Sequence, residues 1–455
     1  MPLAPSNVSD PYPLERLFGR ILSPFEHFLR TATAGGALLM AATVATLVLA
    51  NSPAGDAWSR FWQQPVAIGS FDHAFKHTLR EWVNDALMAL FFLLVGLELK
   101  REVLVGELAS FRDAALPIVA AAGCMIVPAA IYLALNPAGP AASGWGVPMA
   151  TDIAFAIGIL VMLGNRVPRA LVVFLMALAI ADDLGAVLAI AIAYTTGVDR
   201  GALASAAAIL ALLALLNRGG VREPLPYALL GIVLWYFVLR SGVHATIAGV
   251  LLALAIPARP ACTPQRFDRR VSELLGTFRA HAEDPTTPSD ALASPDMATI
   301  AFALERDAKA VQSPLHRAEH ALGPWVTYII LPLFALANAA IVFDPAVLSG
   351  AFASPITLGI VLGLPLGKFI GIAGASGIAV RLGWARLPAG VRWRHLLGGA
   401  WLGGIGFTMS LFISQLAFDA AHAELAKVGI LCASFASALM GIAWLVLSAR
   451  SPPRD

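Results

Sequence analysis

The stretch ALVVFLMALAIADDLGAVLAIAIAY, residues 170–194, decides the fold. Asp182 and Asp183 are its only charged residues. A helix needs about 20 predominantly apolar residues to span the hydrocarbon core of a bilayer. The stretch therefore predicts a membrane-spanning helix that carries two neighbouring carboxylates near its centre. A second stretch, residues 33–50, contains no charged residue and predicts another span.

The charged residues of the chain are too few for a soluble protein. Of its 455 residues, 58% are hydrophobic, 9% aromatic and 13% charged, and the mean hydropathy is +0.75. A soluble globular chain carries roughly 25% charged residues. The composition excludes a disordered chain, a coiled coil and an ordinary soluble enzyme.

Neither nucleic acid nor a resident cofactor is an expected partner. The net charge is only +2, and the basic residues lie in short clusters between apolar runs. Nucleic-acid binding requires instead a basic face with interleaved aromatic residues. Cys124, Cys262 and Cys432 lie far apart, with neither metal-ligand nor disulfide spacing. The cysteines are therefore not expected to hold a metal centre. No cofactor is expected, and the chain is not expected to be an enzyme.

Apolar stretches recur along the chain and predict an all-α polytopic membrane protein with twelve transmembrane helices. The expected spans cover residues 33–51, 84–99, 114–136, 147–163, 170–194, 201–217, 225–239, 242–257, 324–343, 355–380, 396–416 and 428–448. The first stretch is long and begins only at residue 33, so we expect a retained span rather than a cleaved signal peptide.

The basic residues predict the orientation of these spans. When the segments between spans are taken alternately, one set holds 24 of the 31 basic residues and the other holds six, while Lys368 lies inside a span. Lys and Arg accumulate in cytoplasmic loops. An even number of spans places both termini on one side, so we expect both termini in the cytoplasm.

The segments outside the spans complete the expected organisation. Residues 1–30 form a cytoplasmic segment with an amphipathic helix at the membrane surface, and residues 31–257 hold spans one to eight. Residues 258–323 form a long cytoplasmic loop, flexible where it is rich in Pro and Ser and helical where it leads into the ninth span. Residues 324–448 hold spans nine to twelve, and residues 449–455 form a cytoplasmic tail.

Four ionisable residues lie inside the expected spans, and each is a candidate functional residue because charge in hydrocarbon is costly. They are Asp152, which follows Thr151, the neighbours Asp182 and Asp183, and Lys368. Lys368 is compatible with two roles, a counter-ion to a carboxylate or a second titrating group.

The Asp182–Asp183 pair is the most informative of these features. Two close carboxylates in a low dielectric cannot easily both be ionised, so such a pair can hold either protons or a small hard cation. Hard cations prefer oxygen ligands, which the carboxylates, the Thr151 hydroxyl and water supply. The alternative is a buried pair that only packs or bridges helices.

Two of the expected spans are interrupted. Span four begins at residues 146–148 and carries Asp152 in its interior, and span eleven contains Gly403, Gly404 and Gly406. Clustered glycines permit unwound backbone, although close packing of helices through small residues is the alternative. Spans three to five and ten to twelve run in opposite senses, each with the interrupted span in the middle. This arrangement is typical of transporters with inverted-topology repeats.

Six motifs resemble the NhaA family of bacterial sodium/proton antiporters. They are NDALMALFFLLVGLELKRE (84–102), PMATDIAFAIGIL (148–160), FLMALAIADDLGA (174–186), LRSGVHATIAGV (239–250), ILPLFALANA (330–339) and GGIGFTMSLFI (403–413). The resemblance covers nearly the whole chain from about residue 30 to 448. It implies the NhaA-like fold of twelve helices, in which helices four and eleven are unwound and cross near the membrane midplane.

The resemblance also implies a site and an activity. By motif, Asp182 and Asp183 bind the cation, Na+ or Li+, and the proton, with Thr151 and Asp152 beside them and Lys368 paired with Asp182. Family members lie in the bacterial inner membrane, export Na+ or Li+ in exchange for a larger number of protons, and become inactive at acid pH. The implied partners are Na+, Li+, H+, the lipid bilayer and, since members can form dimers, a second copy of the chain.

The pH-response region of the family maps onto two segments and one further histidine. The residues are Glu98, Arg101 and Glu102 at the end of span two, Glu319 and His320 before span nine, and His244. An ordinary charged helix end and a structural histidine are the alternatives. This chain has Gly323 where better-known members have a second histidine, and its loop 258–323 is longer.

Two other functions are alternatives to antiport. A sodium-coupled symporter of an organic anion on the same fold would need a further polar or aromatic pocket near the midplane, for which the sequence offers no candidate. An intramembrane aspartyl protease would need a Gly-x-Gly-Asp motif, which is absent from every expected span. The sequence therefore favours an electrogenic, pH-regulated sodium/proton antiporter.

Overall fold

The computed structural model describes residues 34–68, 75–195, 197–283 and 294–450. Three expected features lie outside these ranges: the amphipathic helix within residues 1–30, most of the flexible part of the long loop, and the end of the tail.

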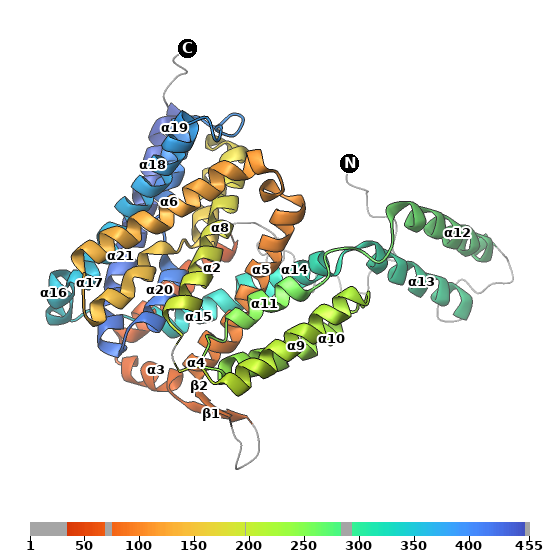
Figure 1. Cartoon of the computed structure of the whole chain (residues 1–455), viewed down its shortest axis with the longest axis horizontal. Helices are drawn as coiled ribbons and strands as arrows, with labels where there is room; N and C mark the ends of the chain where they lie inside the picture. The colour runs from red at the N-terminus through yellow and green to blue at the C-terminus, as the bar shows by residue number, and fades with distance from the viewer. Residues whose placement is uncertain (1–33, 69–74, 196, 284–293, 451–455) are drawn as a thin grey trace, which may run out of the picture.

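The described chain is built almost entirely of helices (Figure 1). In order they are α2 (Ala34–Ala50), α3 (Gly55–Trp62), α4 (Leu79–Trp82), α5 (Met88–Val105), α6 (Phe111–Leu135), α7 (Ile153–Leu163), α8 (Arg169–Ala193), α9 (Arg200–Arg218), α10 (Pro224–Arg240), α11 (Ile247–Ala255), α12 (Pro264–Glu283), α13 (Pro295–Val311), α14 (Pro314–Trp325), α15 (Leu331–Asn338), α16 (Pro345–Ala353), α17 (Pro355–Leu362), α18 (Lys368–Arg381), α19 (Trp393–Leu402), α20 (Phe407–Ala417) and α21 (Ala420–Arg450). Short π-helical segments join α4 to α5, α14 to α15 and α17 to α18, and a 3-10 segment, Pro140–Met149, precedes α7.

Many of these helices are long and apolar enough to cross a membrane. Eight described helices pass that test, and two bent pairs would raise the number to ten: α2 with α3, bent by 118°, and α19 with α20, bent by 45°. A helix satisfies its own backbone hydrogen bonds, as hydrocarbon requires. The chain is therefore a polytopic, mainly helical membrane protein.

Two further expected spans lie outside this count, and only the second of them is shorter than expected. Helix α10 has 17 residues, and α11, in the stretch expected to hold span eight, has only nine. The residues between them, 241–246, form turns, with Gly242 at a φ of 80°. The count of twelve spans therefore stays a prediction.

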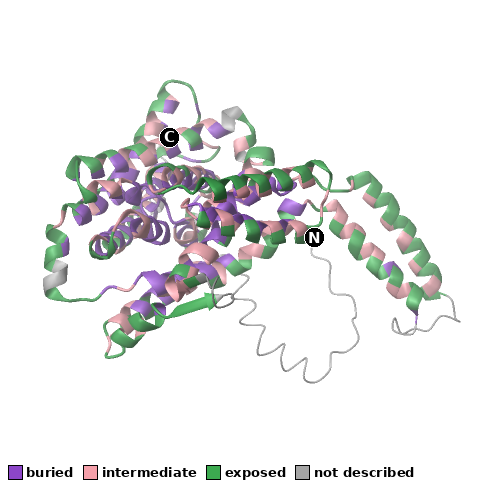
Figure 2. Cartoon of the chain, turned by 60° about the horizontal axis from the view of Figure 1, so that its bottom comes forward, coloured by how far each residue is buried: buried purple, intermediate pink, exposed green. Residues whose placement is uncertain are grey.

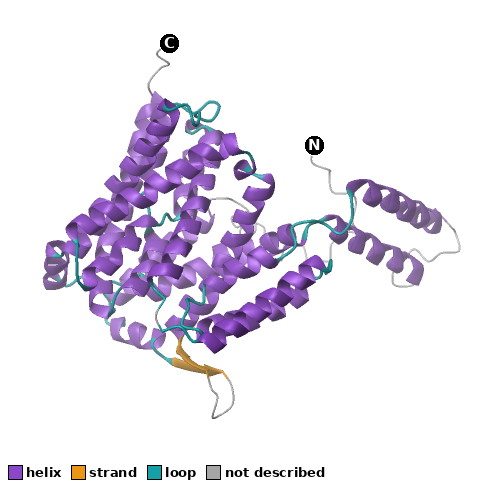
Figure 3. Ribbon diagram, viewed as in Figure 1, coloured by secondary structure: helices purple, strands orange, loops and turns teal. Residues whose placement is uncertain are grey.

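One element departs from the expected all-α fold. The strands β1 (Pro65–Ile68) and β2 (Phe75–Thr78) pair antiparallel between spans one and two (Figure 3). Four-residue strands are too short for hydrophobic alternation to reveal them. The hairpin leads directly into span two, because the Thr78 hydroxyl and the Glu81 carboxylate form a capping box at the start of α4.

The long loop contains more structure than a linker. Helices α12 and α13 lie side by side, joined by an ion pair of 2.7 Å between Arg270 Nε and Asp307 Oδ2, and project away from the other helices (Figure 1). The helix expected to lead into span nine is in fact two helices, α13 and α14. It is interrupted where Ser313 caps α14 and Pro314 occupies its first turn.

Buried residues concentrate where α5 to α8 pack with α17 to α21, whereas α12 and α13 are mainly exposed (Figure 2). Helices α6 and α18 pack closely at Gly123 and Gly371: a Cβ on Gly123 would lie 2.3 Å from the Gly371 carbonyl oxygen. Large apolar side chains such as Ile192, which is 82% exposed, cover the outer surface. Such a surface fits lipid rather than water.

Candidate functional site

Two helices are broken where they meet. Residues 150–152 leave helical conformation between the 3-10 segment Pro140–Met149 and α7, and residues 403–406 separate α19 from α20. The Asp152 N–H donates to the Ile405 carbonyl at 2.6 Å, and the Thr151 hydroxyl lies 3.0 Å from the Gly403 carbonyl. The interruptions expected in spans four and eleven therefore contact each other directly.

A side chain added to any of the glycines at the second break would meet close neighbours. A Cβ on Gly404 would lie 2.7 Å from the Leu364 carbonyl oxygen, and one on Gly406 would lie 3.1 Å from the Ala150 carbonyl oxygen and still closer to the Ser410 hydroxyl. Gly403 would meet a side chain of α18 in the same way. None of the three adopts a positive φ. Unwound backbone and close packing, which were alternatives in the sequence, thus occur together.

Asp152 caps both half-helices that begin at the breaks. Its Oδ1 accepts from the Phe155 N–H of α7 at 3.0 Å. Its Oδ2 accepts from the N–H of Thr408 on α20 at 3.0 Å and from the Thr408 hydroxyl at 2.6 Å. A carboxylate at a helix N-terminus offsets the partial positive charge there. Asp152 thus holds the crossing together through two helix termini at once.

Lys368, the first residue of α18, is fully buried. Its Nζ lies 2.6 Å from Asp182 Oδ2 and 2.9 Å from the Thr151 hydroxyl, and it also donates to the Met149 carbonyl at the end of the 3-10 segment. The ammonium group therefore pairs with one carboxylate and offsets the partial negative charge at the end of the 3-10 segment.

Both carboxylate oxygens of Asp182 have contact partners. Besides Lys368, its Oδ2 lies 2.8 Å from the Thr151 hydroxyl, and its Oδ1 lies 3.3 Å from the Cys124 thiol. The Thr151 hydroxyl has one proton, so it can donate either to Asp182 or to Gly403 but not to both. Asp182 is consequently a paired and hydrogen-bonded carboxylate.

Asp183 is as buried as Asp182, but its contacts are different. Its exposed fraction is 0%, and neither of its carboxylate oxygens has a hydrogen-bond partner among the described residues. An unpaired buried carboxylate is costly unless a proton or a cation accompanies it. Of the two adjacent acids on α8, Asp183 is therefore the one with free ligand capacity.

The residues assigned to pH response lie together at the end of α5, with one exception. Arg101 Nε lies 3.1 Å from Glu319 Oε1, and Arg101 also pairs with Glu102. Glu98 and His320 line a cavity of about 230 Å³ together with Glu319 and Gly323. His244, between α10 and α11, does not line this cavity.

The structure adds site residues that sequence reasoning missed. Thr408, Cys124 and the Met149 carbonyl contact the candidate carboxylates or Lys368. His316 lies one turn before His320, with their rings stacked 6.4 Å apart, and lines the same cavity. The spacing of the two histidines in LHRAEH could have indicated His316. No local signal in the sequence marks the other three.

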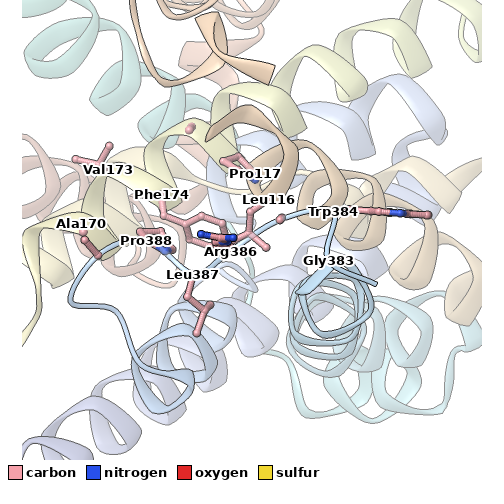
Figure 4. Close-up of a pocket in the computed structure, with 13 residues that line it drawn as sticks. Leu116, Pro117, Ala170, Val173, Phe174, Gly383, Trp384, Arg386, Leu387 and Pro388 are labelled. Atoms are coloured by element: carbon pink, nitrogen blue, oxygen red, sulfur yellow. The ribbon is translucent and has the colours of Figure 1, made fainter. Parts of the chain in front are cut away.

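A larger cavity, of about 850 Å³, lies elsewhere (Figure 4). It is lined by residues of α6 and α8 and by the loop 383–389, and Arg386 lies among apolar side chains there. None of the candidate carboxylates lines it. The candidate carboxylates Asp152, Asp182 and Asp183 are instead almost completely buried.

Known proteins are similar to this chain over nearly its whole length. The family model described as Na+/H+ antiporter 1 matches residues 26–445. A protein named Na(+)/H(+) antiporter NhaA from Syntrophobacter fumaroxidans is 60% identical over 95% of this chain and 92% of its own length. Proteins of the same name from Acidithiobacillus ferrooxidans and Oleidesulfovibrio alaskensis are 55% and 49% identical, over 93% and 98% of this chain and 97% and 98% of their own lengths. The resemblance found in the motifs is confirmed, and the chain belongs to the Na+/H+ antiporter 1 family.

Proposed function

We propose that this chain is a secondary transporter that exchanges Na+ or Li+ from the cytoplasm for protons from outside, in the inner membrane of a bacterium. The observation that carries the proposal is Asp183, a fully buried carboxylate without a hydrogen-bond partner among the described residues, next to the Asp182–Lys368 ion pair. The relatives at 49–60% identity are all named sodium/proton antiporters. Nothing in these comparisons supports a symporter.

The proposed cycle follows from competition for one carboxylate. From the cytoplasm, Na+ displaces the proton of Asp183, and the cation is held by carboxylate oxygens. The loaded site then opens to the other side, where Na+ leaves and a proton takes its place. An uncompensated carboxylate is costly inside the membrane, so the site changes sides only when Asp183 carries one of the two ions. This requirement couples the two fluxes.

The charge on the site predicts how exchange becomes electrogenic. With Lys368 charged and Asp182 ionised, the site is neutral when Asp183 holds either one Na+ or one proton, and such exchange would move no net charge. Each additional proton must therefore bind the ion pair itself. It binds Asp182 after Lys368 has moved away, or it is the proton that Lys368 loses when Na+ binds. Both roles considered for Lys368 remain compatible with this scheme.

The proposal includes the finer architecture of the family. The helices α6, α7 and α8 form one triplet, and α17–α18, α19–α20 and α21 form another, each with the broken helix in the middle. We propose that they are inverted repeats within twelve spans and that both termini face the cytoplasm. A homodimer embedded in the lipid bilayer belongs to the same proposal.

We also propose that the cluster at the end of α5 regulates activity with pH. The support is the geometry: Arg101 joins α5 to Glu319 of α14, and Glu98 shares a cavity with His316 and His320. Ionisable groups on two facing helices change the contact between them when they titrate. His244 lies outside this cavity, and its part in the pH response belongs to the same proposal.

The test of the exchange function is transport in inverted vesicles. Addition of NaCl should dissipate a preformed pH gradient with no organic substrate present, and Asp183→Asn should abolish this effect. Asp199→Asn is the matched control, because Asp199 caps α9 outside the membrane and Asn preserves such a cap. Sodium-dependent dissipation that survives Asp183→Asn would refute the assignment.

A further inference from the structure

Three side-chain amides form a closed ring at one end of the helix bundle. Asn84 Nδ2 donates to Gln415 Oε1 at 2.7 Å, Gln415 Nε2 donates to Asn338 Oδ1 at 2.6 Å, and Asn338 Nδ2 donates to Asn84 Oδ1 at 2.8 Å. Each amide therefore donates once and accepts once within the ring. The three residues belong to the segment between α4 and α5, to α15 and to α20.

An aromatic layer lies beneath the ring on the same three helices. The ring centroids of Phe92 on α5 and Phe334 on α15 lie 5.6 Å and 6.2 Å from that of Phe412 on α20. All three phenylalanines are buried. An amide ring and a layer of aromatic side chains thus close the same seam between three helices.

The two layers lie on the face of α20 that leads away from the ion site. Thr408, which holds Asp152, is followed by Phe412 after four residues and by Gln415 after three more. Residues at this spacing share one face of a helix. Going outward from the helix crossing, this face therefore presents the site contact, then the aromatic layer, then the amide ring.

The ring lies at the end that the basic residues assign to the periplasm. Asn338 is the last residue of α15, and Gln415 lies two residues before the end of α20. Asn84 lies near the start of span two. Spans nine and eleven end on the periplasmic side in the proposed topology, and span two begins there.

Two of the three helices are tied to each other at both ends. Asn84 bonds to Asn338 at the ring, and Arg101 pairs with Glu319 at the opposite end of α5 and of the α14–α15 segment. Helix α20 joins this pair through Gln415 in the ring and Phe412 in the aromatic layer. Movement of α20 away from the pair would break the two bonds of Gln415 and keep the bond between the two asparagines.

We propose that the Asn84–Asn338–Gln415 ring and the phenylalanine layer beneath it form the periplasmic gate of the transport pathway, and that Gln415 is its moving part. The proposal rests on the proposed exchange function. A satisfied amide ring is stable in a dry environment, and its separated amides require water. Opening of the gate and entry of water toward the site are therefore one event.

A reversible cross-link tests the gate. The test variant carries Asn338→Cys and Gln415→Cys, and two of its native cysteines are removed by Cys262→Ser and Cys432→Ser. A short bis-methanethiosulfonate joins the two introduced cysteines, and mass spectrometry verifies the product. Buried Cys124 is kept in every variant. Exchange should fall at least tenfold and return with dithiothreitol. Sodium-induced proton release from the cross-linked, purified protein should persist, because the cytoplasmic side is not constrained.

The control cross-link joins Ala67→Cys to Lys76→Cys, which are register partners in the exposed β-hairpin, and should leave exchange unchanged. Full exchange through the verified Asn338–Gln415 cross-link would overturn the gate. So would a loss of exchange that dithiothreitol does not reverse. Absence of sodium-induced proton release from the parent protein would instead refute the exchange function, so the two failures are distinguishable.

A second measurement does not depend on cross-linking. Gln415→Leu removes both bonds of the moving side chain and should favour the outward-open state. The apparent KM for Na+ at the cytoplasmic face of inverted vesicles should then rise roughly tenfold. Gln63→Leu, an exposed glutamine outside the ring, should not change it. If the ring only stabilises the fold, Gln415→Leu will lower the melting temperature and leave KM unchanged, which would contradict the proposal.

Discussion

Two adjacent residues of α8 have opposite surroundings. Asp182 is neutralised by Lys368 and contacted by Thr151 and Cys124, whereas both oxygens of Asp183 lack a partner among the described residues. Neighbouring positions on a helix point in different directions. One carboxylate can therefore serve the structure while the next stays available to an ion. Burial alone does not distinguish the two.

The Asp182–Lys368 pair should be essential for stability. Removal of one partner leaves an uncompensated buried charge, so Lys368→Ala should lower the free energy of unfolding by about 3–5 kcal/mol. The measurement is thermal or denaturant unfolding in detergent. Lys309→Ala is the control, since Lys309 pairs with Glu305 on the exposed surface of α13, and it should leave stability unchanged. Equal effects of the two substitutions would contradict the assigned role.

Thr408 should matter through its hydroxyl. Thr408→Val keeps the shape of the side chain and removes the bond of 2.6 Å to Asp152. The loss of a hydrogen bond to a buried charged group should cost about 1–3 kcal/mol, and Thr408→Ser should retain most of it. Unfolding of the two variants measures the difference. A Val variant as stable as the Ser variant would show that the hydroxyl does not hold the crossing.

For single residues, the sequence predicts the functional candidates more reliably than it predicts their contacts. The ionisable residues inside the spans stand out because hydrocarbon excludes charge. Their partners do not, because the Lys368–Asp182 pair joins positions 186 residues apart. Thr408 is an ordinary residue of an apolar helix until the fold brings it to Asp152.

The broken helices are the elements that organise the site. Their ends are satisfied by Asp152 and by Lys368, and a Cβ on Gly404 would lie too close to the Leu364 carbonyl oxygen. The breaks were predictable from clustered glycines and from the short start of span four. Their direct contact is a tertiary feature that no local pattern encodes.

Gly404 and Gly374 make a matched pair of glycines. Gly404→Ala would place a Cβ 2.7 Å from the Leu364 carbonyl oxygen, whereas nothing lies within 4 Å of a Cβ on Gly374 inside α18. The first substitution should destabilise the protein by about 1–3 kcal/mol, and the second should stabilise it by roughly 0.5–1 kcal/mol. Opposite shifts in melting temperature would confirm the close approach, and equal shifts would contradict it.

Other elements differ in how far the sequence predicts them. The division between α13 and α14 follows from Ser313 and Pro314, which are ordinary helix-start signals, so this boundary was predictable. The β-hairpin was not, because each strand has only four residues. The shortness of α11 reflects the turns before it, which an apolar composition conceals.

At the scale of the whole molecule, the distribution of Lys and Arg predicts the orientation. It places the long loop with α12 and α13 in the cytoplasm. Cys262 lies at the start of this loop and is partly exposed, while Cys124 is buried. In a Cys432→Ser variant, a membrane-impermeant thiol reagent should therefore label the protein in inverted vesicles and not in right-side-out vesicles. The reverse pattern would invert the proposed topology.

Three parts of the molecule have three proposed functions. The helix crossing holds the candidate carboxylates, the cluster at the end of α5 is the proposed regulatory region, and the amide ring at the opposite end is the proposed gate. The helices that carry the last two features are the same, α5 and the α14–α15 segment. A change of charge at one end of this helix pair can therefore affect its contact with α20 at the other end.

In the proposed cycle, Na+ and the proton compete for Asp183. The direct measurement is proton release from purified protein in weak buffer when NaCl is added at constant ionic strength. The parent protein and Asp199→Asn should release protons in a saturable manner, and Asp183→Asn should release none. Release from Asp183→Asn equal to that of the parent would contradict the claim, because the competing site would then lie elsewhere.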